Sequence, residues 1–87
     1  MRRQIRKYDN RKMYDADSRG YVSMLGLSDL VADGARVAVT CDRTGRDITA
    51  KILARALYER LRHADGSAGS PVLVAAIEGL IARVPRR

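Results

Sequence analysis

The chain of 87 residues has little of what catalytic and metal centres need. It contains one Cys and one His, so a disulfide within the chain is excluded and sites built on Cys or His pairs are missing. Cys41 falls on the apolar side of an expected strand, where a buried thiol usually packs rather than reacts. His63 falls at the expected frayed end of a helix, and Asp15 and Asp17 fall in a polar turn without a convergent acid or base. We therefore expect no enzyme, no cofactor and no metal site.

Large aromatic side chains and long apolar runs are also scarce. There is no Trp and no Phe, and four Tyr accompany a thin core of aliphatic residues and Met. Small scaffolds of this kind often gain stability from a partner subunit, which predicts a homodimer or higher oligomer. No apolar run reaches the ~18–20 residues of a membrane span, and the N-terminus lacks the apolar segment of a signal peptide. We expect a cytoplasmic protein without a membrane span.

Positive charge is what the chain has in excess. It carries 17 Lys and Arg against 10 Asp and Glu, a formal net charge of +7. Six of these cations fall in the first twelve residues, where Asp9 is the one carboxylate. Such a density favours an anionic, phosphate-rich partner, and the tyrosines among the cations could stack on bases or cover sugars. A solvated face or arm is the alternative, and composition alone does not separate the two.

The pattern along the chain predicts an α+β fold. Short strands are expected at residues 4–8, 12–14 and 21–23, joined by turns at 9–10 and 15–20 into an antiparallel meander. A helix follows, with Ser23 as its N-cap and Gly34 as its left-handed C-terminal residue, and Gly26 is expected to weaken it by roughly 1 kcal/mol. The alternation over residues 36–42 predicts one further, half-buried strand with Val37, Val39 and Cys41 on its apolar side, followed by a turn at 44–45.

A second helix is expected over residues 48–62, opened by Asp47 or Thr49. Its apolar arc holds Ile52, Leu53, Ala56, Leu57 and Leu61. Arg60 interrupts that arc, so the helix is expected to fray there or to meet a partner. On the opposite side, four residues share an arc of about 60° and form a second basic stripe: Lys51, Arg55, Tyr58 and Arg62. Taken alone, such a stripe is typical of an ordinary solvated helix face.

The C-terminal part reads as a Gly- and Ser-rich linker over residues 64–70 and a helix over 71–84. Ser70-Pro71 is a typical helix start, because Pro suits the first helical position. The helix is apolar on nearly all sides, which predicts burial in its own core or in another subunit. A dimer interface is the favoured account.

The N-terminal order of residues resembles a known family. Arg6-Lys7-Tyr8-Asp9-Asn10-Arg11-Lys12-Met13-Tyr14-Asp15 is similar to the signature Lys-Tyr-x-Asn-Arg-Arg/Lys-Leu/Met-Tyr-Asp/Asn. That signature opens the N-terminal DNA-binding domain of bacterial polyhydroxyalkanoate (PHA) synthesis repressors, also described as regulators of polyhydroxybutyrate (PHB) accumulation. The similarity covers residues 4–55, with departures at Leu25, Gly26 and Cys41, and the region that follows is short.

The resemblance implies a transcriptional repressor of storage-granule genes whose partners are double-stranded DNA and the polymer itself. Residues 1–63 would be the DNA-binding domain, 64–70 a linker and 71–84 an oligomerisation element. The candidate DNA contacts are Arg6, Lys7, Tyr8, Asn10, Arg11, Lys12 and Tyr14, supported by Tyr21. Arg2 and Arg3 extend the same basic run.

Side-chain chemistry refines these candidates without deciding each role. Arg11 and Lys12 are expected to meet phosphate, since Lys and Arg pair with it and an Arg fork also matches guanine. Asn10 matches an adenine edge or simply holds the turn, and we favour the turn. One of Tyr8 and Tyr14 is expected to pack inside the core. Two other functions stay open: a granule- or surface-associated protein without specific DNA binding, and a binder of single-stranded RNA.

Overall fold

The computed structural model describes residues 2–9, 12–64 and 69–86. Its described part is an α+β fold of four strands and three helices, as the sequence predicts. In chain order the elements are β1 (Arg2–Lys7), β2 (Met13–Asp15), β3 (Gly20–Val22), α1 (Met24–Ala32), β4 (Arg36–Cys41), α2 (Thr49–His63) and α3 (Pro71–Arg83).

The strands form one mixed sheet in the order β3-β2-β1-β4. β1, β2 and β3 pair antiparallel and make the predicted meander. The further strand, β4, pairs parallel with β1, a neighbour that the sequence pattern does not specify. A parallel neighbour needs a crossover connection, and the chain supplies one by passing through α1 before it enters β4.

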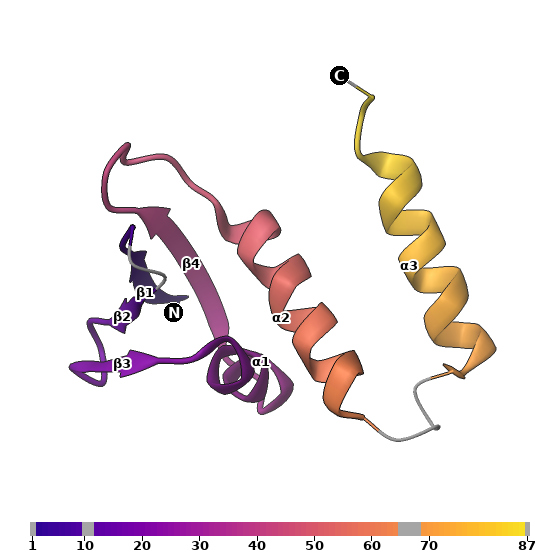
Figure 1. The fold of residues 1–87 in the computed structure, drawn as a ribbon, viewed down its shortest axis with the longest axis horizontal. Coiled ribbons are helices and arrows are strands. Elements are labelled where there is room, and N and C mark those ends of the chain that lie inside the picture. Colours follow the sequence, from indigo (N-terminus) through magenta and orange to yellow (C-terminus); the bar gives the residue numbers. More distant parts are fainter. Residues whose placement is uncertain (1, 10–11, 65–68, 87) are drawn as a thin grey trace.

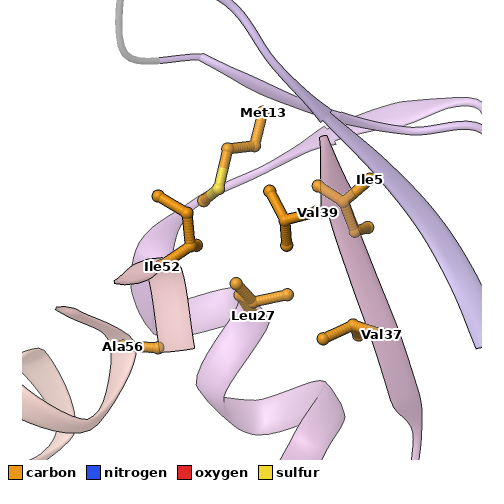
Figure 2. Close-up of a cluster of buried hydrophobic side chains, with 7 residues drawn as sticks. All are labelled: Ile5, Met13, Leu27, Val37, Val39, Ile52 and Ala56. Carbon is orange, nitrogen blue, oxygen red and sulfur yellow. The ribbon is translucent and has the colours of Figure 1, made fainter. Parts of the chain in front are cut away.

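One face of the sheet is packed by α1 and α2 (Figure 1). The register places Ile5 opposite both Val39 and Asp15, so alternate side chains of neighbouring strands point to this face together. Figure 2 shows side chains of β1, β2, β4, α1 and α2 converging into one core. Its buried members are Ile5, Met13, Leu27, Val37, Val39, Ile52 and Ala56.

The predicted residues bound α1. The Ser23 hydroxyl accepts a hydrogen bond from the Gly26 amide at 2.9 Å. At the other end Gly34 has φ +102°, and its amide and the next one make the two hydrogen bonds of a Schellman motif. A Cβ at Gly26 would lie 3.1 Å from a methyl of Val22 and 3.2 Å from the Ser23 hydroxyl. Glycine at this position therefore lets the helix begin close against the end of β3.

A hydrogen-bonded corner opens α2 and covers the outer edge of β4. The Asp47 carboxylate accepts hydrogen bonds from the Thr49 amide at 2.9 Å and from its hydroxyl at 2.6 Å. These hydrogen bonds lower the pKa of Asp47. The Thr49 hydroxyl oxygen accepts from the Val39 amide at 2.8 Å, and the Val39 carbonyl accepts from the Ile48 amide at 2.9 Å. The N-cap of α2 is Ile48, between the two residues that the sequence offered, and Asp47 and Thr49 are hydrogen-bonded to each other across it.

Three expectations about individual residues are wrong. Tyr8 and Tyr14 are both half-buried, and neither belongs to the core, because strand alternation points them away from the helices. Asp15 is not in a plain polar turn: it ends β2 and is 2% exposed, with its carboxylate 3.4 Å from Nε of Arg3. Cys41 is half-exposed rather than buried, and hydrogen bonds, the largest from the Thr44 hydroxyl, lower the pKa of its thiol.

The contacts of two residues near the C-terminal end of α2 test two further expectations. The helix does not end at Arg60 but continues to His63, and the Arg60 guanidinium lies 3.1 Å from the Asp29 carboxylate of α1. His63 is exposed, as expected, and lies 3.8 Å from the Glu59 carboxylate.

α3 begins at the predicted Ser70-Pro71 boundary and lies beside α2, on the side away from the sheet (Figure 1). None of its residues is buried, so its apolar side chains are not part of this chain's core. An apolar groove of about 570 Å³ runs between α2 and α3. Most of the predicted linker, residues 65–68, lies outside the described residues. Within the described part, no helix is long and apolar enough to cross a membrane.

Candidate nucleic-acid interface

The second face of the sheet has no helix against it in the described part of the chain (Figure 1). The register aligns Arg6 with Thr40 on one side and with Tyr14 on the other, and Tyr14 with Tyr21. Opposed residues of paired strands point to the same face. One row across all four strands therefore contains a cation, a hydroxyl and two aromatic rings.

Aromatic and cationic side chains interlock on this face. The rings of Tyr14 and Tyr21 meet edge to face, with centroids 5.6 Å apart and an interplanar angle of 76°. Nζ of Lys12 lies 5.2 Å from the centroid of the Tyr21 ring, within cation–π range. Tyr21 is 68% exposed, so its outer surface is available to a ligand.

A hollow of about 230 Å³ lies beside this row, between β1, β2 and β4. Tyr8 and Tyr14 both line it, which places the two signature tyrosines on the same side of the hairpin. Gln4 and Thr40 add an amide and a hydroxyl to its lining, groups that can both donate and accept hydrogen bonds. We call the surface made by the row and the hollow the open face: Gln4, Arg6, Tyr8, Lys12, Tyr14, Tyr21 and Thr40.

Two ion pairs border the open face. The Arg6 guanidinium lies 3.1 Å from the Asp42 carboxylate, and Nε of Arg43 lies 3.8 Å from that of Asp9. All four side chains are at least 43% exposed, so each pair contributes little to stability. Only one guanidinium nitrogen of Arg6 is hydrogen-bonded to Asp42, which leaves further donors of the fork for another ligand.

The sequence-predicted contact residues do not all lie together. Arg6, Tyr8, Lys12, Tyr14 and Tyr21 are on the open face. Arg3 and Lys7 alternate with them and point to the helix-packed face, where Arg3 meets Asp15 and Lys7 lies opposite Met13 and Cys41. Arg2 lies at the far end of β1, opposite Arg36 and in a hollow that also includes Asp47. Asn10 and Arg11 lie outside the described residues.

The second basic stripe lies on α2, away from the open face. Lys51, Arg55, Tyr58 and Arg62 are all exposed. Arg62 is paired with Glu59, its guanidinium 3.2 Å from the carboxylate. Because α2 packs on the other face of the sheet, the stripe and the open face are two separate basic surfaces.

Sequence reasoning missed the contributions of Gln4 and Thr40 to the open face. Both are polar strand residues whose neighbours become known only with the parallel pairing of β1 and β4. The alternation of residues 36–42 is a usable signal, because it separates Thr40 from the buried side of its strand. No group of three potential metal ligands occurs among the described residues.

Comparison with protein families agrees with the sequence resemblance. The model of the PHB/PHA accumulation regulator DNA-binding domain matches residues 4–63, a segment that runs from β1 to the end of α2 and leaves α3 outside. No curated protein and no solved structure matches the chain. The family match covers well over half of the sequence, and the chain belongs to the PHB/PHA accumulation regulator DNA-binding domain family.

Proposed function

We propose that this member of a DNA-binding regulator family is a sequence-specific repressor of storage-granule genes, and that it meets duplex DNA with the open face. The observation that carries the proposal is the row Arg6, Tyr14 and Tyr21, with Lys12 over the outer ring, on a sheet face that no described helix covers. Cations can pair with the phosphates of a nucleic acid, and the rings between them can contact its sugars and bases. A face adapted only to solvent would not need exposed rings among its cations.

The cationic, polar and aromatic side chains of the open face would make different contacts with DNA. Lys12 and one or more donors of Arg6 bind phosphate oxygens and set the position of the protein on the duplex. Gln4 and Thr40 supply hydrogen-bonding groups for base edges. The rings of Tyr14 and Tyr21 cover sugars beside these contacts. The net charge of +7 attracts the duplex from a distance and raises the rate of encounter.

A gel-shift titration tests specific repression. The fragment would carry the promoter of a granule-associated protein gene, with random DNA of equal length as the control, at several salt concentrations. We expect the promoter to bind at least about 100-fold more tightly than random DNA at moderate salt. The log–log salt slope then gives the number of neutralised phosphates, at about −0.9 for each. Equal affinity for both fragments at every salt concentration would refute sequence-specific repression.

We further propose that α3 makes the chain a homodimer or a higher oligomer. Val72, Leu80 and Ile81 of α3 and its C-cap residue Val84 are 58–79% exposed, and such a set of apolar side chains is typical of an interface. A second copy would cover them and the groove between α2 and α3, and would supply a second open face for a two-fold symmetric operator. Light scattering after size exclusion should give a multiple of 9.6 kDa for the wild type and the single mass for Ile81→Lys.

Granule association is the second candidate function, and the same exposed side chains favour it. Apolar residues on α3 could adsorb to the polymer if no second copy covers them. Pelleting the protein with polymer granules, with and without residues 70–87, tests this. Loss of co-sedimentation on truncation supports adsorption through α3, and unchanged co-sedimentation refutes it.

A further inference from the structure

A second hollow lies on the helix-packed side of the sheet, where β1 and β2 approach α2. Its volume is about 400 Å³, within the range of small-molecule sites. Met13 and Met24 form its apolar floor, Met13 as a buried core residue and Met24 as a half-buried one packed against the core. Among the described residues, the rest of the lining comes from Lys7, Arg55, Tyr58 and Glu59. The site combines an apolar floor with charged groups from two elements that are distant in sequence.

The charges around this hollow do not balance. Within the described residues, Lys7 and Arg55 have no ion pair or side-chain hydrogen bond. Glu59 is engaged elsewhere, because its carboxylate lies 3.2 Å from the Arg62 guanidinium and 3.8 Å from the His63 imidazole. In the described lining, Lys7 and Arg55 thus share the hollow with Glu59, a carboxylate that already has partners. An anionic group between Lys7 and Arg55 would pair with both.

The lining also indicates what else the ligand carries. A bare phosphate would occupy the cations and leave the methionine surface uncovered. Thioether side chains adapt to apolar groups of varied shape, and the Tyr58 ring adds an aromatic wall. We propose that this hollow binds a small organic anion, with its phosphate or carboxylate between Lys7 and Arg55 and its apolar part on Met13 and Met24.

This site is separate from the open face. Lys7 and Met13 are cross-strand partners on the helix-packed face, and Arg6 and Tyr14 are the neighbouring partners on the other face. A ligand here would therefore lie behind the open face, with only the sheet between them. Lys7, which the sequence groups with the DNA contacts, takes a different role in this proposal.

The test is a titration of the full chain, without DNA, followed by the ¹³C-methyl NMR signals of Met13 and Met24. Hexyl phosphate and hexanoate are the probes and show which headgroup is preferred, while inorganic phosphate and hexanol each lack one half of the ligand. We expect one of the two probes to move both methyl signals saturably, with an affinity at least about tenfold above that for phosphate or hexanol.

Two variants test whether binding depends on the hollow itself or only on the positive charge of α2. Arg55→Gln should weaken binding at least about fivefold, and it changes an exposed helix position that leaves the core intact. Lys51→Gln removes an equal charge from the same helix outside the hollow and should change binding less than twofold. Absent methyl shifts, equal loss in both variants, or inorganic phosphate binding as tightly as the probes would overturn the proposal. Because no DNA is present, failure here leaves the DNA-binding proposal untouched.

Discussion

The same strands build both faces of the sheet, but one face is packed in the core and the other is not covered by a described helix. β1 gives Ile5 to the core and the next residue, Arg6, to the open face; β2 gives Met13 to the core and Tyr14 to the open face. α1 and α2 cover one face and no described helix covers the other. The strand period of two thus separates residues that hold the fold from residues free to bind, and substitutions on the two faces should have different consequences.

The largest expected effect is on the helix-packed face. Leu27 is fully buried, so Leu27→Ala should lower the free energy of unfolding by about 3 kcal/mol, through lost burial and a cavity. Urea denaturation followed by circular dichroism measures this. Val31→Ala, on the exposed side of the same helix, is the control and should cost less than about 1 kcal/mol. Equal losses in the two variants would contradict the assignment of the core.

A smaller loss is expected for the buried carboxylate. Asp15→Ala leaves Arg3 without its partner and the Asp17 amide without its acceptor, and should cost about 2 kcal/mol, below the usual value for breaking a buried ion pair because Arg3 is one-third exposed. Asp17→Ala is the matched control, since its backbone amide rather than its side chain bonds to Asp15. Thermal unfolding compares the two. A loss for Asp17→Ala as large as that for Asp15→Ala would show that the two contacts of the Asp15 carboxylate contribute little.

On the open face, a substitution should reduce DNA affinity more than it reduces the stability of the fold. Tyr21→Ala should weaken DNA binding about fivefold, which corresponds to about 1 kcal/mol, while lowering stability by less than that. Its ring is exposed, meets Tyr14 edge to face and lies beneath the Lys12 ammonium, contacts at the surface on which the fold depends little. Tyr58→Ala on α2 should leave DNA affinity within about twofold. Fluorescence anisotropy with labelled promoter DNA measures both variants, and a greater loss for Tyr58→Ala would point to the helix stripe.

The smallest effect concerns pH. Hydrogen bonds from Thr49 lower the pKa of Asp47 in the folded state, so its carboxylate stabilises the fold above the pKa of the unfolded chain, near 4. That contribution is lost as the pH falls through the lower, folded-state pKa. Between pH 7 and pH 2 the wild type should therefore lose more stability than Asp47→Asn. Parallel acid-unfolding curves for the two proteins would contradict this role of Asp47.

Local features of the fold could be predicted from the sequence, and distant pairings could not. Ser23 and Gly34 signal helix ends through their own backbone chemistry, and the alternation of residues 36–42 signals a strand. The parallel pairing of β1 with β4 joins segments about 34 residues apart, and nothing within either segment specifies the partner. The burial of Asp15 is not predictable for the same reason, because its partner Arg3 lies on the neighbouring strand.

The candidate site, too, could be predicted in its local features but not in how its residues are arranged in space. The family signature identifies the basic hairpin, but the composition of the hairpin does not show which of its cations lie on the open face. As neighbours on one strand, Arg6 and Lys7 point to opposite faces, and only the packing of α1 and α2 shows which of the two faces is covered. The expectation that Tyr8 or Tyr14 fills the core came from the scarcity of large aromatic residues. Leu27 and Ile52, with Met13, fill that space instead.

The central claim is that the open face, rather than the basic stripe on α2, binds DNA. The most direct test compares the double variant Arg6→Gln, Lys12→Gln with the double variant Lys51→Gln, Arg55→Gln on one promoter fragment at one salt concentration. Both remove two positive charges, so their loss of general attraction is matched. We predict that the open-face variant binds at least about tenfold more weakly than the wild type and that the α2 variant stays within about threefold. Equal losses, or a greater loss for the α2 variant, would contradict the claim.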